Sequence, residues 1–134
     1  NLSFQARTSD MKEVYRRTKI LLAPSRLEEG WGRVASEAQY NGIPVLASSR
    51  GALPEAVGPG GVLLDPDAPI EDWVAALRRM WDDRAYYAEL SAAALRHSDR
   101  SDICPSAQID TLLALADQAI RLRHPDELVM GRMA

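Results

Sequence analysis

Residues 25–48 constrain the fold of this chain more than any other stretch, because a glycine turn, a helical pattern and an apolar strand follow one another there. The turn is acidic and flexible, and it is built on Glu29, Gly30 and Gly32. The helical pattern ends at Gly42, which can adopt the left-handed conformation that closes a helix. A turn, helix and strand in this order are typical of a parallel α/β layer.

Short apolar runs predict the strands of this layer. They cover residues 19–23, 43–47 and 62–64, and the first is continuous enough to predict a strand buried on both faces. Residues 2–6 alternate apolar and polar side chains, which predicts a further, half-buried strand. With helices between them, these runs predict a parallel sheet whose strand–helix–strand connections are right-handed.

Helical spacing predicts the segments between the strands. A helix over residues 10–18 begins with a capping-box pattern, in which Glu13 follows Asp10 after three positions. Residues 54–57 have room for only a short helical turn. One face of the helix over residues 33–40 is expected to carry Val34, Glu37 and Ala38.

Beyond Pro69 the pattern is helical only. Residues at helical spacing predict a first helix with Ile70, Trp73, Val74, Leu77 and Trp81. They predict a second helix with Tyr86, Leu90, Ala93, Ala94 and His97. A polar break over residues 98–105 precedes a third helix over residues 109–122. Trp73, Trp81 and Tyr86 could form a ligand-stacking set, but their spacing favours packing on the inner faces of amphipathic helices.

Composition excludes several classes of function. The 134 residues carry a formal net charge of -3 with acidic and basic side chains interleaved, so we expect no nucleic-acid surface. Cys104 is the single cysteine and there are two histidines, which excludes an internal disulfide and a zinc-ligand set. No run approaches the roughly 20 apolar residues of a membrane span. We therefore expect no metal site, no transmembrane segment and a reducing, cytosolic compartment.

The turn after Ala23 is the expected ligand site, because open parallel sheets bind ligands beyond the carboxyl ends of their strands. A helix that begins near Gly32 presents the free amides of Gly32, Arg33 and Val34 to an anion, together with the positive end of its dipole. The glycines let a ligand approach the backbone closely. A diphosphate fits this arrangement.

Two carboxylates flank the expected phosphate position. Glu29 lies in the turn and Glu37 lies between one and two turns into the helix. Ionised carboxylates accept strong hydrogen bonds from hydroxyls, which suits sugar rings at both ends of a diphosphate. From these residue types alone, a solvated acidic turn fits equally well.

Four linked motifs resemble one family of enzymes. They cover residues 25–38, 42–48, 51–57 and 61–66. In order and spacing they closely resemble the donor-binding domain of retaining glycosyltransferases with the GT-B fold, glycosyltransferase family 4 (group 1) in particular. The resemblance implies an α/β fold: a parallel-sheet, Rossmann-like half domain of the GT-B fold followed by C-terminal helices. It implies that residues 1–97 are the C-terminal part of the nucleotide-sugar donor-binding domain, and that residues 98–134 are a linker, a crossing helix and a tail.

The resemblance also implies roles for the residues of the turn. Glu29 is expected to be the catalytic-site residue that contacts hydroxyls of the donor sugar and orients it. The backbone of Gly30, Trp31 and Gly32 is expected to line the sugar pocket. Trp31 stands where Phe or Tyr is commoner in the family, so the donor sugar does not follow from the resemblance.

The nucleotide end of the donor is expected to lie at the helix. The resemblance implies that the amides of Arg33 and Val34 meet the diphosphate and that Glu37 holds the ribose hydroxyls. Arg33 replaces a residue that is usually apolar, and two alternatives stay open for its side chain: a cation near the phosphates or a side chain in solvent. Arg50 and Ala52 also alter a loop that normally carries two glycines.

The implied activity is that of a hexosyltransferase-type glycosyltransferase, with retention and without a metal or other cofactor. The family's amino-terminal acceptor domain and the Arg and Lys that clamp the diphosphate are not among these residues. We therefore expect a fragment that alone is inactive and self-associates through exposed apolar surface. For the full-length protein, a peripheral position at the membrane stays open within the expected cytoplasmic location.

Two other classes of function stay open. An epimerase with a similar fold would change a nucleotide sugar without an acceptor, and a phosphorylase would need a cofactor-binding lysine, for which the chain offers Lys12 and Lys19. A non-catalytic α/β interaction module would bind no nucleotide.

Overall fold

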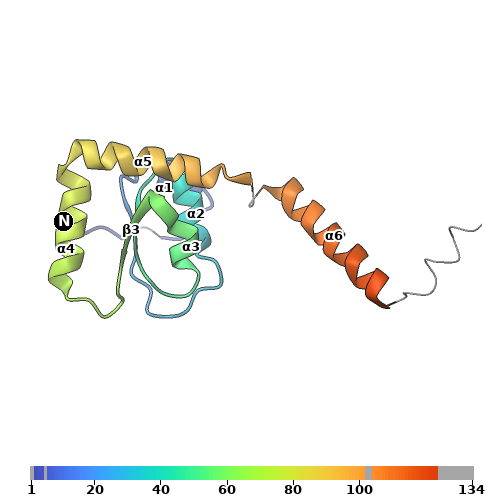
Figure 1. The fold of residues 1–134 in the computed structure, drawn as a ribbon. Helices are drawn as coiled ribbons and strands as arrows, with labels where there is room; N and C mark the ends of the chain where they lie inside the picture. The colour runs from blue at the N-terminus through green and yellow to red at the C-terminus, as the bar shows by residue number, and fades with distance from the viewer. Residues whose placement is uncertain (1, 5, 102–103, 124–134) are drawn as a thin grey trace, which may run out of the picture. The chain divides into compact units, whose positions relative to one another are not determined.

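The computed structural model describes residues 2–4, 6–101 and 104–123 (Figure 1). The chain divides into two compact units, Asn1–Ser98 and Asp99–Ala134. The first unit holds the sheet and all but one of the described helices, and the second holds helix α6.

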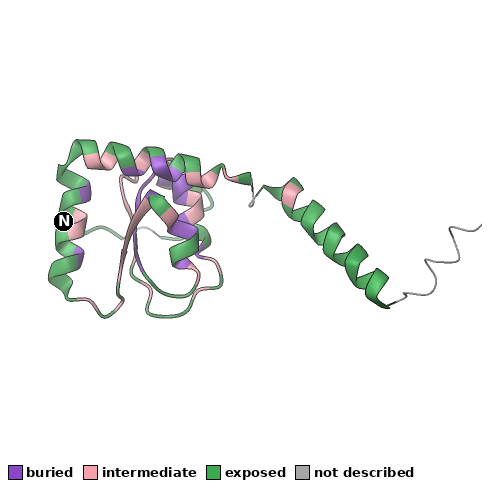
Figure 2. Ribbon diagram, viewed as in Figure 1, coloured by how far each residue is buried: buried purple, intermediate pink, exposed green. Residues whose placement is uncertain are grey.

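Three parallel strands form the sheet of the first unit, in the order β1 (Leu21–Ala23), β2 (Val45–Ser48) and β3 (Gly61–Leu64). In this register Leu46 is the partner of Leu22 on one side and of Val62 on the other. Every residue of β2 is buried, because this strand has a neighbour on each side and helices over both faces (Figure 2). The predicted α/β class with a parallel, Rossmann-like sheet is confirmed.

The helices of the first unit are α1 (Met11–Arg17), α2 (Arg33–Tyr40), α3 (Leu53–Val57), α4 (Ile70–Asp82) and α5 (Arg84–Ser98), with a short 3-10 turn, η1 (Gly58–Gly60), before β3. They divide the apolar core between the two faces of the sheet. On one face, Val45 and Ala47 of β2 pack with α2 and α3. On the other, Leu46 packs with Trp73 and Met80 of α4 and with α5. Alternate side chains of one strand therefore belong to two cores.

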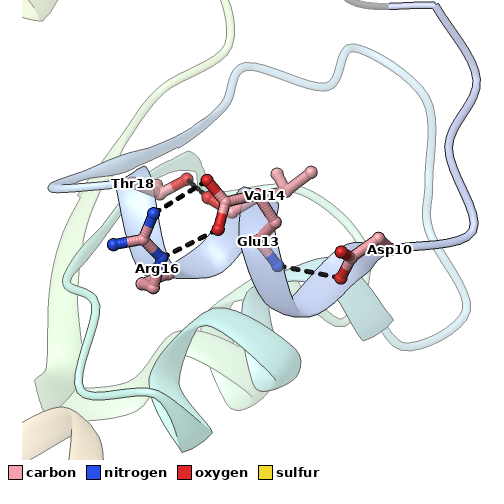
Figure 3. Close-up of polar contacts among 5 residues, drawn as sticks. All are labelled: Asp10, Glu13, Val14, Arg16 and Thr18. Atoms are coloured by element: carbon pink, nitrogen blue, oxygen red, sulfur yellow. Dashed lines mark hydrogen bonds and ion pairs between the residues drawn. The ribbon is translucent and has the colours of Figure 1, made fainter.

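Helix α1 begins with half of the predicted capping box (Figure 3). The amide of Glu13 donates to the Asp10 carboxylate at 3.1 Å, as expected. The Glu13 carboxylate does not return a hydrogen bond to the Asp10 amide but accepts two from Arg16, at 2.8 and 2.9 Å. The Asp10 amide donates instead to the Thr8 hydroxyl. Thr18 closes the helix by donating its hydroxyl to the Val14 carbonyl.

Two predictions about strands are wrong. Residues 2–4 and 6 form no strand, and Leu2 and Phe4 are exposed. An alternating pattern gives a strand only where a neighbouring strand pairs with it, and among the described residues none does. β1 is not buried on both faces, since the Leu22 side chain is 49% exposed at the edge of the sheet.

Two predicted helix faces also need correction. In α2 the buried residues are Ala35, Ala38 and Gln39, whereas Val34 is exposed. The small alanines allow α2 to lie close to the sheet, and the Gln39 amide donates a hydrogen bond to the Val57 carbonyl at 2.6 Å. A polar residue thereby satisfies its hydrogen bonds within the core.

In α4, only Trp73 and Met80 are buried, and three residues that the pattern placed inside are exposed: Ile70, Val74 and Trp81. Trp81 packs instead beneath the Lys19 ammonium group, which lies 4.2 Å from the ring centroid. Tyr86 is partly buried against the second core, as expected.

The second unit contains α6 (Pro105–Arg123), which includes the predicted third helix and has no buried residue. Cys104, just before it, is exposed. Residues 102–103 of the predicted polar break and the tail over residues 124–134 lie outside the described part of the chain. Within the described ranges, no helix has the length and apolar character needed to cross a membrane.

Candidate active site

The candidate site lies where the loops after the three strands meet. The buried Ser48 hydroxyl, at the end of β2, donates to the Ser25 carbonyl in the turn after β1 at 2.6 Å. Arg26 in the same turn forms an exposed ion pair with Asp67 beyond β3, at 3.2 Å. The turn that the sequence singled out therefore contacts the segments that follow both of the other strands, at the carboxyl edge of the sheet.

The backbone of Glu29 is held by the loop after β2. The Ala52 amide donates to the Glu29 carbonyl at 3.1 Å. Gly51 has a φ of +54°, and a Cβ atom there would lie 2.6 Å from the Glu29 amide nitrogen. Only glycine fits such a position without a shift of one of the two loops. The contact fixes the place of Glu29, whose side chain is partly buried.

Helix α2 begins at Gly32, which has a left-handed conformation with φ 72° and ψ 50°. A Cβ atom at Gly32 would meet the Leu53 side chain at 2.7 Å and would lie 3.7 Å from a carboxylate oxygen of Glu29. The Glu29 carboxylate is therefore beside the first turn of the helix. The absence of a side chain at this N-cap also leaves the first amides without a cap from that residue.

The amides of Arg33 and Val34 precede the first hydrogen bond of the helix, which runs from the Ala35 amide to the Gly32 carbonyl at 2.8 Å. No earlier turn supplies carbonyls to these two amides, so they point out of the end of the helix. Their direction and the helix dipole favour an anion in front of Gly32.

Trp31 and Gly30 form the outer part of the turn. The Trp31 indole donates its N–H to the Ser36 hydroxyl at 3.0 Å, so the ring lies against the first turn of α2. A Cβ atom on Gly30 would find no atom within 4 Å, which leaves space above the turn. Ser36 thus has a contact that the sequence did not indicate.

Glu37 is held by two other side chains. The Tyr15 hydroxyl donates to its Oε2 atom at 2.7 Å, and Arg33 Nη2 lies 3.5 Å from its Oε1 atom. Burial, followed by this hydrogen bond and the Glu37 charge, raises the pKa of Tyr15 to about 12. Glu37 and Tyr15 also line a surface hollow of about 430 Å³ together with Ser36, Tyr40 and Asn41.

The structure places the seven predicted site residues on one turn and the helix that follows it. The Arg33 side chain is 87% exposed and reaches back to Glu37. Sequence reasoning missed Tyr15, Gly51 and Leu53. The glycine in the loop after a strand was a signal for Gly51, whereas Tyr15 and Leu53 read as ordinary apolar positions.

A metal site has no support from side chains in the part of the chain that the structure describes. No group of three or more His, Cys, Asp or Glu residues lies close enough together there to hold an ion.

Two curated relatives are similar to most of this chain. One is the D-inositol 3-phosphate glycosyltransferase of Thermobispora bispora, 41% identical over 93 residues, which cover 68% of this chain and 21% of that protein. The protein of the same name from Corynebacterium kroppenstedtii is 37% identical over 101 residues, which cover 74% of this chain and 22% of the relative. The chain thus spans about a fifth of the length of these relatives.

Two solved structures share the fold. The sucrose-phosphate synthase from Thermosynechococcus elongatus has a TM-score of 0.66 and 26% identity, over 79% of this chain and 27% of that one. The Anabaena protein HepE, solved in complex with UDP and glucose, has a TM-score of 0.68 and 22% identity, over 83% of this chain and 30% of that one. The second likeness is one of fold alone.

Residues 1–97 match the family described as glycosyl transferases group 1. The match covers most of the chain and includes the sheet, the turn with Glu29, helices α1 to α4 and all but the last residue of α5. It agrees with the named relatives and with the fold of the synthase. The chain therefore belongs to the group 1 glycosyltransferases.

Proposed function

We propose that this chain forms the donor side of a glycosyltransferase, which transfers a sugar from a nucleoside diphosphate sugar to a hydroxyl acceptor with retention at the anomeric carbon. One observation carries the proposal. Helix α2 begins at a left-handed Gly32 with two amides pointing out of its end, and the Glu29 carboxylate lies beside them. An anion site next to a sugar-binding carboxylate suits a sugar diphosphate.

Each end of the donor has matching chemistry. The amides of Arg33 and Val34 and the helix dipole stabilise the negative charge that grows on the diphosphate as its bond to the sugar breaks. Glu29 accepts hydrogen bonds from the sugar hydroxyls and thereby orients the anomeric carbon. Glu37 accepts hydrogen bonds from the ribose. No step in this scheme uses a metal ion or another cofactor.

The complete enzyme is proposed to be longer than this chain. The curated relatives, which are named as glycosyltransferases, are about five times as long as the aligned part, since 21% of one and 22% of the other is covered. We infer that an acceptor domain and further diphosphate-binding side chains belong to the rest of the protein. The chain alone then binds a nucleotide sugar weakly and transfers no sugar.

The test replaces Glu29 in the full-length protein and measures transfer from nucleotide sugars. Glu29→Ala is expected to lower kcat/KM at least about tenfold, because hydrogen bonds to a charged group contribute on the order of 1.5 to 3 kcal/mol. The matched control is Glu28→Ala, which removes an exposed carboxylate from the neighbouring position. Equal kinetics for Glu29→Ala and the unsubstituted enzyme would reject the assignment.

The same assay separates the other classes of function. Omission of the acceptor stops a transferase, whereas an epimerase continues to convert the nucleotide sugar. A full-length protein that shows no thermal shift with UDP, GDP or ADP would be an interaction module instead.

A further inference from the structure

Tyr15 connects α1 to the middle of α2 through one hydrogen bond. Its hydroxyl donates to Glu37 Oε2 at 2.7 Å, across 22 positions of sequence. The residue is buried with a relative exposure of 9%. The hydroxyl group therefore belongs to a residue of the protein interior, and it donates to the carboxylate of a Glu37 side chain that is 43% exposed.

The surroundings of Glu37 leave its carboxylate partly unused. The second oxygen, Oε1, lies 3.5 Å from an Arg33 side chain that is mostly in solvent, and so this pair is weakly constrained. Asn41 Nδ2 donates to the Glu37 backbone carbonyl and not to its side chain. A carboxylate offers about four acceptor sites, so Glu37 can accept further hydrogen bonds while it keeps the one from Tyr15.

A purely structural role for the hydroxyl is the simpler alternative. The Tyr15 ring already packs in the core that contains Ala35, Ala38 and Ile43, and this apolar contact holds α1 against α2 without the hydroxyl. The hydroxyl adds a short, charge-assisted hydrogen bond to a single acceptor, which restricts the orientation of that acceptor. Its effect falls on the Glu37 carboxylate more than on the packing of the helices.

We propose that Tyr15 is a positioning residue for donor binding: its hydroxyl fixes the Glu37 carboxylate so that the remaining acceptor sites receive the two ribose hydroxyls of the nucleotide. This rests on the proposed function, and it makes the site selective for ribonucleoside over deoxyribonucleoside diphosphates. The hollow lined by Tyr15 and Glu37 provides space on that side of the carboxylate.

The experiment measures binding of UDP, GDP and ADP to the full-length protein by titration calorimetry, with and without Tyr15→Phe. This change keeps the ring in the core and removes only the hydroxyl. The affinity for the diphosphate that binds tightest is expected to fall about fivefold, because the change removes part of the free energy that a hydrogen bond to a charged acceptor contributes.

The matched control is Tyr87→Phe. The Tyr87 hydroxyl, on α5, is also partly buried and donates to a backbone carbonyl, that of Lys19, at 3.1 Å. Its loss removes a hydrogen bond between two segments of the fold, so the melting temperature falls while the affinity for the diphosphate stays within about twofold. If both variants lost affinity, the loss in Tyr15→Phe would be due to general destabilisation of the protein, and the proposal would be overturned.

The decisive probe is the 2′,3′-dideoxy form of the same diphosphate. It lacks the hydroxyls that Glu37 would bind, so Tyr15→Phe and the unsubstituted protein should bind it equally. An equal loss for the ribose and dideoxy forms, or no loss for either, would overturn the proposal.

The failure of this inference can be told from the failure of the proposed function. If the unsubstituted protein binds none of the three diphosphates, both fall. If it binds one, and Glu37→Ala weakens that binding while Tyr15→Phe does not, only the role of Tyr15 is wrong.

Discussion

Gly51 and Glu29 lie against each other although they belong to loops after different strands. A glycine without a Cβ atom allows the loop after β2 to reach the Glu29 backbone, and the neighbouring Ala52 amide completes the contact. The backbone position of the proposed catalytic-site residue is thus determined by a residue outside its own motif.

Gly51→Ala is expected to destabilise the protein by about 2 kcal/mol or more, because of the positive φ and the clash with the Glu29 amide. Donor binding should weaken with it. The control is Gly30→Ala, at a glycine with open space and no positive φ, where the change should stay within about 0.5 kcal/mol. Denaturant unfolding measures both, and equal stabilities would contradict the proposed clash.

Tyr15 gives the site a dependence on high pH. Its pKa rises from 10.0 to about 12 in the folded protein, owing first to burial and then to Glu37. Since the folded state favours the protonated phenol, this contribution to stability is complete below pH 10 and is lost as the pH rises through 12. Burial also raises the pKa of Tyr87, so the two tyrosines act in the same direction.

Ultraviolet titration of tyrosinate, combined with unfolding at several pH values, measures this effect. Tyr15→Phe should remove the Tyr15 part of the decline in stability at high pH, and Glu37→Gln should lower the pKa of Tyr15 only in part, because burial remains the larger cause. A Tyr15 whose pKa stays near its ordinary value of 10.0 would show that its side chain is neither buried nor bonded to Glu37 in solution.

At the scale of elements, α1 depends on its cap more than on its surface ion pair. Asp10→Ala should lower the free energy of unfolding by about 1 kcal/mol, because the Glu13 amide loses its acceptor. The control, Glu13→Gln, weakens the exposed pair with Arg16 and leaves the cap intact, so its effect should be smaller. Chemical denaturation compares the two, and a larger effect at Glu13 would reverse this order.

The elements themselves could be predicted from the sequence where local chemistry decides them. The cap at Asp10, the left-handed Gly42 and the strand that became β2 followed from residue type and spacing. The wrong predictions concern partners: residues 2–6 have a strand pattern, and Val34 and Ile70 have helical spacing. Whether such residues are buried depends on what packs against them, which a local pattern does not contain.

The candidate site divides in the same way. Gly30, Gly32 and the two glutamates lie in one continuous stretch, so their association could be predicted from spacing. Tyr15, Gly51 and Leu53 come from other segments and reach the turn only through the packing of α1 and of the loop after β2. Their contributions could not be predicted without the fold.

At the scale of the whole molecule, apolar side chains stay exposed on two surfaces. Leu22, Ile70 and Val74 lie around an apolar hollow of about 180 Å³ on the first unit, and α6 carries a second exposed set that includes Leu113. Surfaces of this kind favour association. The chain should therefore sediment as a mixture of monomer and larger species as its concentration rises.

Charged substitutions identify the surface responsible. If the hollow mediates association, the double change Ile70→Lys and Val74→Lys should return the chain to a monomer, while Leu113→Lys on α6 should leave it associated. The opposite result would place the contact on α6, and a monomer at every concentration would refute the expectation of self-association.

β2 joins two cores that share no side chain. Val45 and Ala47 belong to one core and Leu46 belongs to the other, so the same strand supports the helices on both faces. Loosening of either core releases the strand on which the other depends. The first unit therefore melts in one cooperative transition, and the turn that ends at Gly32 loses its anchor at Ser48 in the same step.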